Sequence, residues 1–325
     1  MTAPSAIALF ANRNHPQIPL LEEAVRERGG CPVVCDARLD GWQGMAAGTG
    51  GLFWNGVDFS RVGAVHVLCS AVSTPPGLFP VRDRARHLED TARFLREQER
   101  QAAVQTFLGM YAATGGLVVN PPGGAWVDHE AKAGFHEKLR AWGFPVPRSL
   151  AASDPVAARR FVKEVGQAVI KPLAGVGSTR AVTPEDLDRE RLAVCPAFLQ
   201  ERVEGTMVRA HVVAGKLVLA LAVEGSAGAD SRTRPQSITP LALPGPAAEI
   251  LVSATRRLGL WYAAWDAVLC RETPVLLDCN PGPYVLWLGL DHARKIFLEL
   301  AGFLVEFART QSVDRAARSV RAVSC

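Results

Sequence analysis

The chain lacks the motifs of several common classes of enzyme and binding protein. Its 325 residues contain no Gly-x-Gly-x-x-Gly dinucleotide loop, no Gly-x-Ser-x-Gly elbow of a serine hydrolase and no His-Glu-x-x-His zinc helix. The seven cysteines form no paired Cys-x-x-Cys clusters, which argues against structural zinc and favours free thiols in a reducing cytosol. There is no signal-peptide pattern, and no apolar run of the roughly 20 residues that span a bilayer. We therefore expect a cytoplasmic protein with no membrane partner.

Lysine is also scarce, because only six of the 36 basic residues are lysines. The net charge of +4 is mild and does not indicate a nucleic acid partner. The rarity of lysine makes Lys132 and Lys171, which lie beside other candidate functional residues, more noticeable. Nothing in the composition decides whether the chain forms a homo-oligomer.

Strand-like and helical segments alternate in the first part of the chain, which is typical of a parallel sheet. We expect an α/β protein, α+β in its C-terminal part, with an open α/β domain over residues 1–122. A middle block over 123–204 and a block with antiparallel strands over 205–312 follow, and 313–325 resemble a frayed tail.

The segment 263–283, AAWDAVLCRETPVLLDCNPGP, carries the strongest functional signal. It predicts two apolar strands joined by a three-residue turn over 271–273. That register places Asp266 directly opposite Asp278, at a Cβ separation of about 5 Å where like charges repel each other. Two facing carboxylates therefore require a physical reason.

A divalent metal would supply that reason. Asn280 follows Asp278 by two residues and shares its face, and Mg²⁺ takes oxygen ligands from carboxylates and phosphates. One alternative is that the two acids simply lie on a solvated surface of the hairpin. Another is that the strand pairing is shifted by one residue, which would turn every side chain to the other face. The opposite face is expected to pack into a core and comprises Trp265, Ala267, Leu269, Val275, Leu277 and Cys279.

Two upstream segments could bind a nucleotide. Lys171 ends an apolar strand, and the loop after it contains Gly175 and Gly177, whose backbone can approach a phosphate closely. An ordinary turn explains the same glycines. FLQERVEG at 198–205 is a strand leading into a linker, where backbone groups could read adenine and Glu204 could bind ribose, although many strands end in Glu-Gly.

The arginines and histidines give weaker evidence for a function than the segments described above. Arginine binds phosphate and carboxylate bidentately, but a solvated basic loop explains at least one of the arginines of this stretch, Arg202, Arg209, Arg232 and Arg234. The histidines lack a metal-binding spacing, and we interpret four of them as structural or surface residues: His129, His136, His211 and His292.

In their order along the chain these segments resemble the ATP-grasp superfamily. The resemblance covers roughly residues 118–305 and is strongest to its RimK-like branch, especially to ligases that cyclise ribosomal peptides into ω-ester or ω-amide graspetides. It is carried by VVNPPGG, EAKAGFHEKLRAWGFPVPRSL, AVIKPLAGVGSTR, FLQERVEG, TMVRAHVVAGKLVLAL, ADSRTRP and the Asp-bearing hairpin. Asp278 stands where this branch commonly has glutamate, and Ser231 where an aromatic residue is usual.

The resemblance implies an ATP-grasp fold with an N-terminal pre-ATP-grasp domain, ATP and Mg²⁺ as cofactors, and a role for each matched residue. The expected metal ligands are Asp266, Asp278 and Asn280, and the expected catalytic residues are Arg209 and Arg232. The expected ATP contacts are Lys132, Lys171, Gly175, Gly177, Ser178, Glu201, Arg202, Val203 and Glu204.

The implied activity is an ADP-forming ligase. A carboxylate attacks the γ-phosphorus of ATP to give an acyl phosphate, and an amine or hydroxyl then forms an amide or ester. The expected partners are a peptide or small-molecule carboxylate and its amine or hydroxyl acceptor. Three alternatives stay open: a ligase joining small amino acids, a kinase of a small hydroxylated metabolite, and a non-catalytic nucleotide-binding module.

Overall fold

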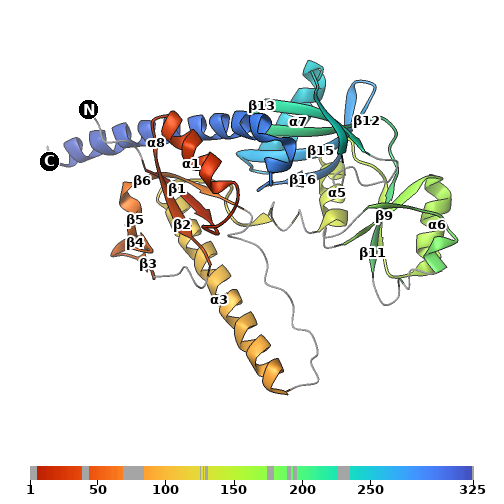
Figure 1. Ribbon diagram of the computed structural model, residues 1–325, viewed down its shortest axis with the longest axis horizontal. Coiled ribbons are helices and arrows are strands. Elements are labelled where there is room, and N and C mark those ends of the chain that lie inside the picture. Colours follow the sequence, from red (N-terminus) through yellow and green to blue (C-terminus); the bar gives the residue numbers. More distant parts are fainter. Residues whose placement is uncertain are drawn as a thin grey trace. The chain divides into compact units, whose positions relative to one another are not determined.

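The computed structural model divides the chain into two compact units (Figure 1). It describes residues 6–38, 44–68, 84–124, 126, 128, 131–173, 179–188, 192, 196–225 and 235–323. Unit 1 combines residues 1–122 with 282–325, and unit 2 comprises 123–281. The proposed boundary at residues 204 and 205 lies inside unit 2 and stays a prediction.

Unit 1 is built on a parallel sheet with the strand order β2-β1-β6-β7. Its strands are β1 (Ala6–Ala11), β2 (Cys31–Asp36), β6 (Val62–Val67) and β7 (Leu117–Val119). Helix α1 (Ile18–Glu27) connects β1 to β2, and β1 is buried along nearly its whole length. The predicted open parallel α/β arrangement is confirmed.

A small antiparallel sheet in unit 1 was not expected. It consists of β3 (Met45–Gly48), β4 (Gly51–Trp54) and β5 (Val57–Asp58), and leads through the short helix η1 (Phe59–Arg61) into β6. Its Trp54 belongs to an aromatic core that also contains rings from β1, η1 and helix α3 (Arg84–Ala113). The closest pair in that core is Phe59 and Phe107, whose ring centroids are 4.7 Å apart.

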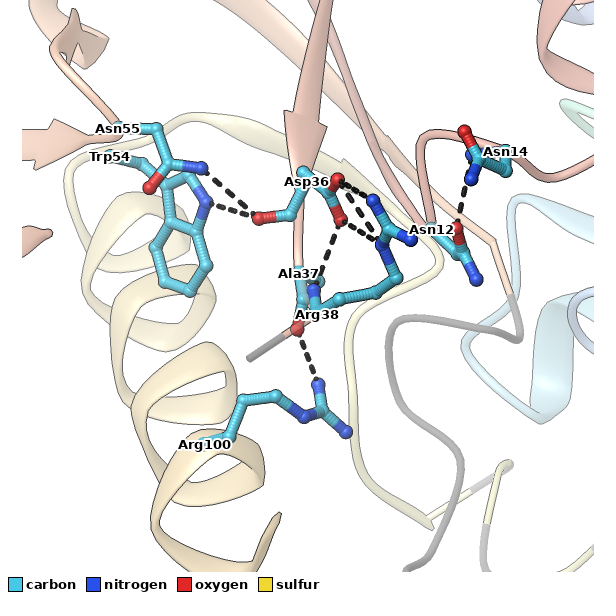
Figure 2. A network of polar contacts seen from close by, with 8 residues as sticks. All are labelled: Asn12, Asn14, Asp36, Ala37, Arg38, Trp54, Asn55 and Arg100. Carbon is cyan, nitrogen blue, oxygen red and sulfur yellow. Dashed lines mark hydrogen bonds and ion pairs between the residues drawn. The ribbon is translucent and has the colours of Figure 1, made fainter. Parts of the chain in front are cut away.

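Polar contacts hold this small sheet and α3 at the end of β2 (Figure 2). The Asp36 carbonyl accepts hydrogen bonds from Trp54 Nε1 at 3.1 Å and from Asn55 Nδ2 at 3.2 Å. The buried Asp36 carboxylate is bound by the Arg38 guanidinium at 2.9 Å. Arg100 of α3 donates to the Ala37 carbonyl at 2.9 Å. These contacts hold elements of unit 1 together, so we interpret the network as structural and not as a binding site.

The C-terminal segment completes unit 1. Helix α8 (Leu290–Val323) follows the short helix η3 (Leu286–Leu288) and packs against α1 and β6. A Cβ at Gly63 would lie 2.3 Å from the Cβ of Ala308, so the absence of a side chain permits this close approach. We expected a frayed tail over 313–325, but α8 continues through to Val323, because this stretch is rich in the helix formers alanine and arginine.

Buried histidines are expected to make the fold sensitive to acid. His66 Nδ1 donates to the Val119 carbonyl at 2.8 Å, and burial lowers the pKa of His66 to about 4. Because the unfolded chain binds the proton near pH 6.5, stability should fall as pH falls from 6.5 toward 4, by about 1.4 kcal/mol per pH unit for each such histidine. His66→Gln keeps a donor and should flatten this slope in denaturant titrations at several pH values, and an unchanged slope would contradict the contribution of His66.

Unit 2 contains two antiparallel sheets. The four-stranded sheet has the order β10-β9-β11-β8, with β8 (Ser149–Ala152), β9 (Ala168–Pro172), β10 (Arg180–Val182) and β11 (Ala197–Glu201). Helix α6 (Pro155–Val165) packs on it, and Asp154 caps the helix by accepting hydrogen bonds from the Val156 and Ala157 N–H groups. A short helix, η2 (Asp186–Asp188), also packs there.

The five-stranded sheet has the order β14-β13-β12-β15-β16. Its strands are β12 (Thr206–Val213), β13 (Lys216–Gly225), β14 (Pro235–Pro240), β15 (Tyr262–Cys270) and β16 (Thr273–Asn280). Helices α5 (Lys132–Ala141) and α7 (Gly245–Arg257) supply apolar residues to the core on one face of this sheet. No helix among the described residues is long and apolar enough to cross a bilayer.

Candidate functional site

The β15–β16 hairpin brings the two predicted carboxylates face to face. Asp266 pairs with Asp278, as the sequence predicted. The expected turn was wrong, because Cys270 pairs with Thr273 and the turn therefore has two residues, Arg271 and Glu272. A bulge between Asp266 and Ala267 then inserts one extra residue in β16 and restores the Asp pair.

The bulge also changes which residues of β16 enter the core. Leu276 is fully buried in the apolar core with Trp265, Ala267 and Cys279, and Leu269 packs at its edge. We expected Val275 and Leu277 on that face, which was wrong, since the extra residue shifts the alternation by one position. Asn280 lies beyond the bulge, so it still shares the face of Asp278.

A basic side chain accompanies each carboxylate. Lys132, the first residue of α5, places its Nζ 2.5 Å from Asp278 Oδ2, and both side chains are largely buried. Arg209 pairs with Asp266 across β12 and β15, with Nη1 2.8 Å from Oδ1. The sequence predicted that all four residues serve one site, and the structure places them together. Their paired charges sum to zero, which explains how the buried Asp278 and the partly buried Asp266 can face each other.

The donor set fits a hard divalent cation better than zinc. Among the described residues no group of three or more His, Cys, Asp or Glu side chains is placed to bind a metal ion. The site instead offers two facing carboxylates and the Asn280 amide on one face of the hairpin. Mg²⁺ is characteristically held by one or two carboxylates together with substrate phosphates, so these residues fit it.

Lys171 lies on β9, near the end of the strand as predicted. Its Nζ donates to the side-chain oxygen of Gln200 on β11 at 2.9 Å. The loop glycines and two further predicted residues lie outside the described residues: Gly175, Gly177, Ser178 and Arg232.

The predicted adenine hinge follows β11. The Glu201 N–H donates to the Arg148 carbonyl and the Arg202 N–H to the Gln167 carbonyl, both at 2.9 Å. These two donors are therefore used by the protein itself, contrary to the expectation that every residue of 201–203 offers its backbone. Contact of the Glu201 carbonyl and the Val203 N–H with adenine stays a prediction. Glu204 is exposed and accepts a hydrogen bond from Gln167 Nε2 at 3.3 Å.

Gly205 sets the spacing between the predicted hinge and the β15–β16 hairpin. It has φ +150°, and a Cβ there would lie 2.4 Å from the Leu269 carbonyl oxygen on β15. We expect Gly205→Ala to destabilise the protein by about 2 kcal/mol in denaturant unfolding, because the backbone of β15 must move. Gly215→Ala is the control, since its φ of +76° adds strain but its Cβ would meet nothing within 4 Å. Equal losses in the two variants would contradict the steric explanation.

Sequence reasoning assigned His136 only to the structural or surface class. It lies one helical turn after Lys132 on α5, and its Nε2 donates to the Leu277 carbonyl at 2.9 Å. Burial lowers the pKa of His136 to about 4, so the ring is neutral at pH 7. His136 therefore anchors the strand that carries Asp278. The four-residue spacing from Lys132 was the available signal, because such residues share one helix face.

Comparison with known proteins identifies the fold. A family model described as "ATP-grasp domain" matches residues 130–283. The ATP-grasp ligase PsnB, solved with precursor peptide PsnA2 and AMPPNP, is 25% identical with a TM-score of 0.77, over 95% of this chain and 100% of that one. No curated protein matches the chain.

Two further solved structures share the fold at lower identity. The macrocyclase MdnC from Microcystis aeruginosa, bound with precursor peptide MdnA, is 22% identical with a TM-score of 0.71, over 93% of this chain and 99% of that one. A RimK domain ATP-grasp protein from Sphaerobacter thermophilus is 17% identical with a TM-score of 0.57, over 92% of this chain and 98% of that one.

The chain contains an ATP-grasp domain and has the ATP-grasp fold. The predicted resemblance and fold class are thereby confirmed, and the PsnB structures that share this fold are of an ATP-grasp ligase, in agreement with the predicted enzyme class. The roles of the individual site residues stay predictions.

Proposed function

We propose that the protein uses ATP and Mg²⁺ to activate a carboxylate of a peptide and to join it to an amine or hydroxyl. The observation that carries the proposal is the Asp266–Asp278 pair with Lys132 and Arg209 beside it, inside an ATP-grasp domain. PsnB structures with a precursor, Mg and ADP support the cofactors, and its precursor peptides support a peptide substrate. A cytoplasmic location stays a prediction.

The protein's part in the reaction is mainly electrostatic. Asp266, Asp278 and Asn280 would hold Mg²⁺, which when bound neutralises charge on the β- and γ-phosphates. Lys132 and Lys171 supply positive charge for the remaining phosphate oxygens, and Arg209 lies beside Asp266 where the γ-phosphate is expected. These fixed charges act on the transferring phosphoryl group without reorganisation at the moment of reaction.

The chemical steps balance as two displacements. A carboxylate oxygen of the substrate attacks the γ-phosphorus, the bond to the β-phosphate oxygen breaks, and ADP leaves with an acyl phosphate formed. The amine or hydroxyl then attacks the acyl carbon and loses its proton, and inorganic phosphate leaves. The net product has lost one water for each amide or ester formed.

Mass spectrometry tests this proposal. We expect the full-length protein with ATP, Mg²⁺ and synthetic peptides rich in Glu or Asp and in Thr or Lys to yield products lighter by one water per bond. Added hydroxylamine should trap the acyl phosphate as a hydroxamate. Matched peptides with Gln and Asn in place of the acids should remain unchanged. Peptides that gain a phosphate stably, with no hydroxamate, would instead identify a kinase.

A further inference from the structure

The bulge in β16 lies directly beside a predicted metal ligand. Asp266 and Ala267 are consecutive on β15, but their partners on β16 are Asp278 and Leu276, so Leu277 is the extra residue of the bulge. A bulge interrupts the hydrogen-bond ladder and changes the direction of the side chains next to it. The direction of the Asp278 carboxylate therefore depends on what holds Leu277.

His136 holds this extra residue from helix α5. Its Nε2 donates to the Leu277 carbonyl at 2.9 Å, and the histidine is fully buried. Because a carbonyl only accepts, Nε2 carries the proton of the neutral ring, and Nδ1 is left as an acceptor. The contact with Leu277 thus determines what kind of group can bind the other ring nitrogen.

Ser149 of β8 supplies the matching donor. Its Oγ lies 3.3 Å from His136 Nδ1, and its hydroxyl donates to that nitrogen. The Phe198 ring of β11 meets the imidazole edge to face, with ring centroids 5.3 Å apart. The backbone partner of Ser149 is Gln200, which directly precedes the predicted hinge. Hydrogen bonds from Ser149 to His136 and from His136 to Leu277 therefore connect the four-stranded sheet with the β15–β16 hairpin.

We propose that Ser149 and His136 are positioning residues for Mg²⁺, acting through Leu277 on the direction of the Asp278 carboxylate. The proposal rests on the proposed function, in which Asp278 binds Mg²⁺. Ser149 fixes the orientation of the imidazole, and the imidazole fixes the bulge. Replacement of groups that support a metal ligand commonly lowers metal affinity or activity by about 10- to 100-fold.

The readout is the gain in AMPPNP affinity that Mg²⁺ produces, which we call the Mg²⁺ enhancement. It is the affinity for AMPPNP with Mg²⁺ divided by the affinity in EDTA. Displacement of a fluorescent ATP analogue from the full-length protein measures both affinities. A role confined to the fold would lower the two affinities by one factor and leave the Mg²⁺ enhancement unchanged.

Ser149→Ala removes one hydroxyl and keeps the backbone pairing with Gln200. We expect the Mg²⁺ enhancement to fall about threefold, as expected for loss of one hydrogen bond between neutral groups. The melting temperature should stay within a few degrees of the wild type. Ser253→Ala is the matched control, because Ser253 Oγ donates to Glu249 on the same helix, α7, at 2.8 Å. It should keep the wild-type Mg²⁺ enhancement.

His136→Phe keeps an aromatic ring but loses both hydrogen bonds. We expect the Mg²⁺ enhancement to fall about 10-fold, because the bulge loses its contact with α5. The double variant Ser149→Ala/His136→Phe should have the same Mg²⁺ enhancement as His136→Phe alone, since Ser149 acts only through His136. If His136→Phe does not fold, the result for Ser149→Ala decides the proposal.

The outcomes distinguish this inference from the proposed function. Asp278→Asn is the reference and should lower the Mg²⁺ enhancement at least as much as His136→Phe does. If it does so but Ser149→Ala keeps the wild-type value, the positioning role is wrong and the proposed function stands. A double variant with a lower value than His136→Phe would show that Ser149 does not act through His136. If Mg²⁺ does not raise the affinity of the wild type, or Asp278→Asn changes nothing, the assignment of Asp278 in the proposed function fails.

Discussion

Replacement of Asp278 by asparagine is expected to lower ATP-dependent product formation about 100-fold or more. The change keeps the size of the side chain but removes one of the two negative ligands proposed for Mg²⁺. Even residues that only support metal ligands commonly change affinity or activity 10- to 100-fold, so about 100-fold is a lower bound for a ligand. Product yield measured by mass spectrometry at saturating ATP tests this expectation.

The matched control lies on the same hairpin. Glu272→Gln removes a carboxylate from the exposed two-residue turn and should retain wild-type activity. Circular dichroism should show that both variants are folded. Wild-type product yield from Asp278→Asn would remove Asp278 from the metal site. Equal losses in the two variants would point to general damage to the hairpin.

The pairing of Asp266 with Asp278 could be predicted from the sequence, but partly because two errors cancelled. The expected turn was one residue too long, and the bulge in β16 was not foreseen. The bulge depends on contacts from distant parts of the chain. The Leu276 N–H donates to the Pro145 carbonyl at 2.8 Å, and the Leu277 carbonyl accepts from His136. Local alternation of apolar residues contains no information about such partners.

Two parts of unit 1 were missed for a similar reason. The strands β3 to β5 are only two to four residues long, so they show little alternation of apolar and polar residues, and an aromatic core stabilises their position. The packing of α8 on β6 depends on the contact of Gly63 with Ala308, which are 245 residues apart. The family resemblance, in contrast, depended on motifs that are each local, and it was confirmed.

The ion pair between Lys132 and Asp278 could not be predicted from the sequence motifs. The resemblance assigned Lys132 to ATP and Asp278 to the metal, and the structure pairs these two residues directly. The side chains of Lys132 and Asp278 are 7% and 12% exposed, so water screens the pair only weakly. A buried pair of this kind is strongly destabilised when one partner is removed alone.

Lys132→Met is therefore expected to destabilise the protein by about 3–5 kcal/mol in denaturant unfolding, because the buried Asp278 carboxylate loses the positive charge of Lys132. The double variant Lys132→Met/Asp278→Asn should be more stable than Lys132→Met alone, with a coupling free energy of about 2 kcal/mol. The exposed pair Arg26 and Glu22 on α1 is the control, and its cycle of Arg26→Met and Glu22→Gln should give a coupling of only about 0.3 kcal/mol.

Activity should not follow stability in this cycle. The double variant regains much of the stability but lacks both a phosphate-binding lysine and a metal-binding carboxylate, so its product yield should stay as low as that of Asp278→Asn. That divergence would show that Lys132 and Asp278 are kept for binding Mg²⁺·ATP, since an uncharged pair satisfies the fold equally well. A double variant that regains wild-type turnover would contradict the assignment of both residues, and a Lys132→Met variant as stable as the wild type would show that the pair is not buried in solution.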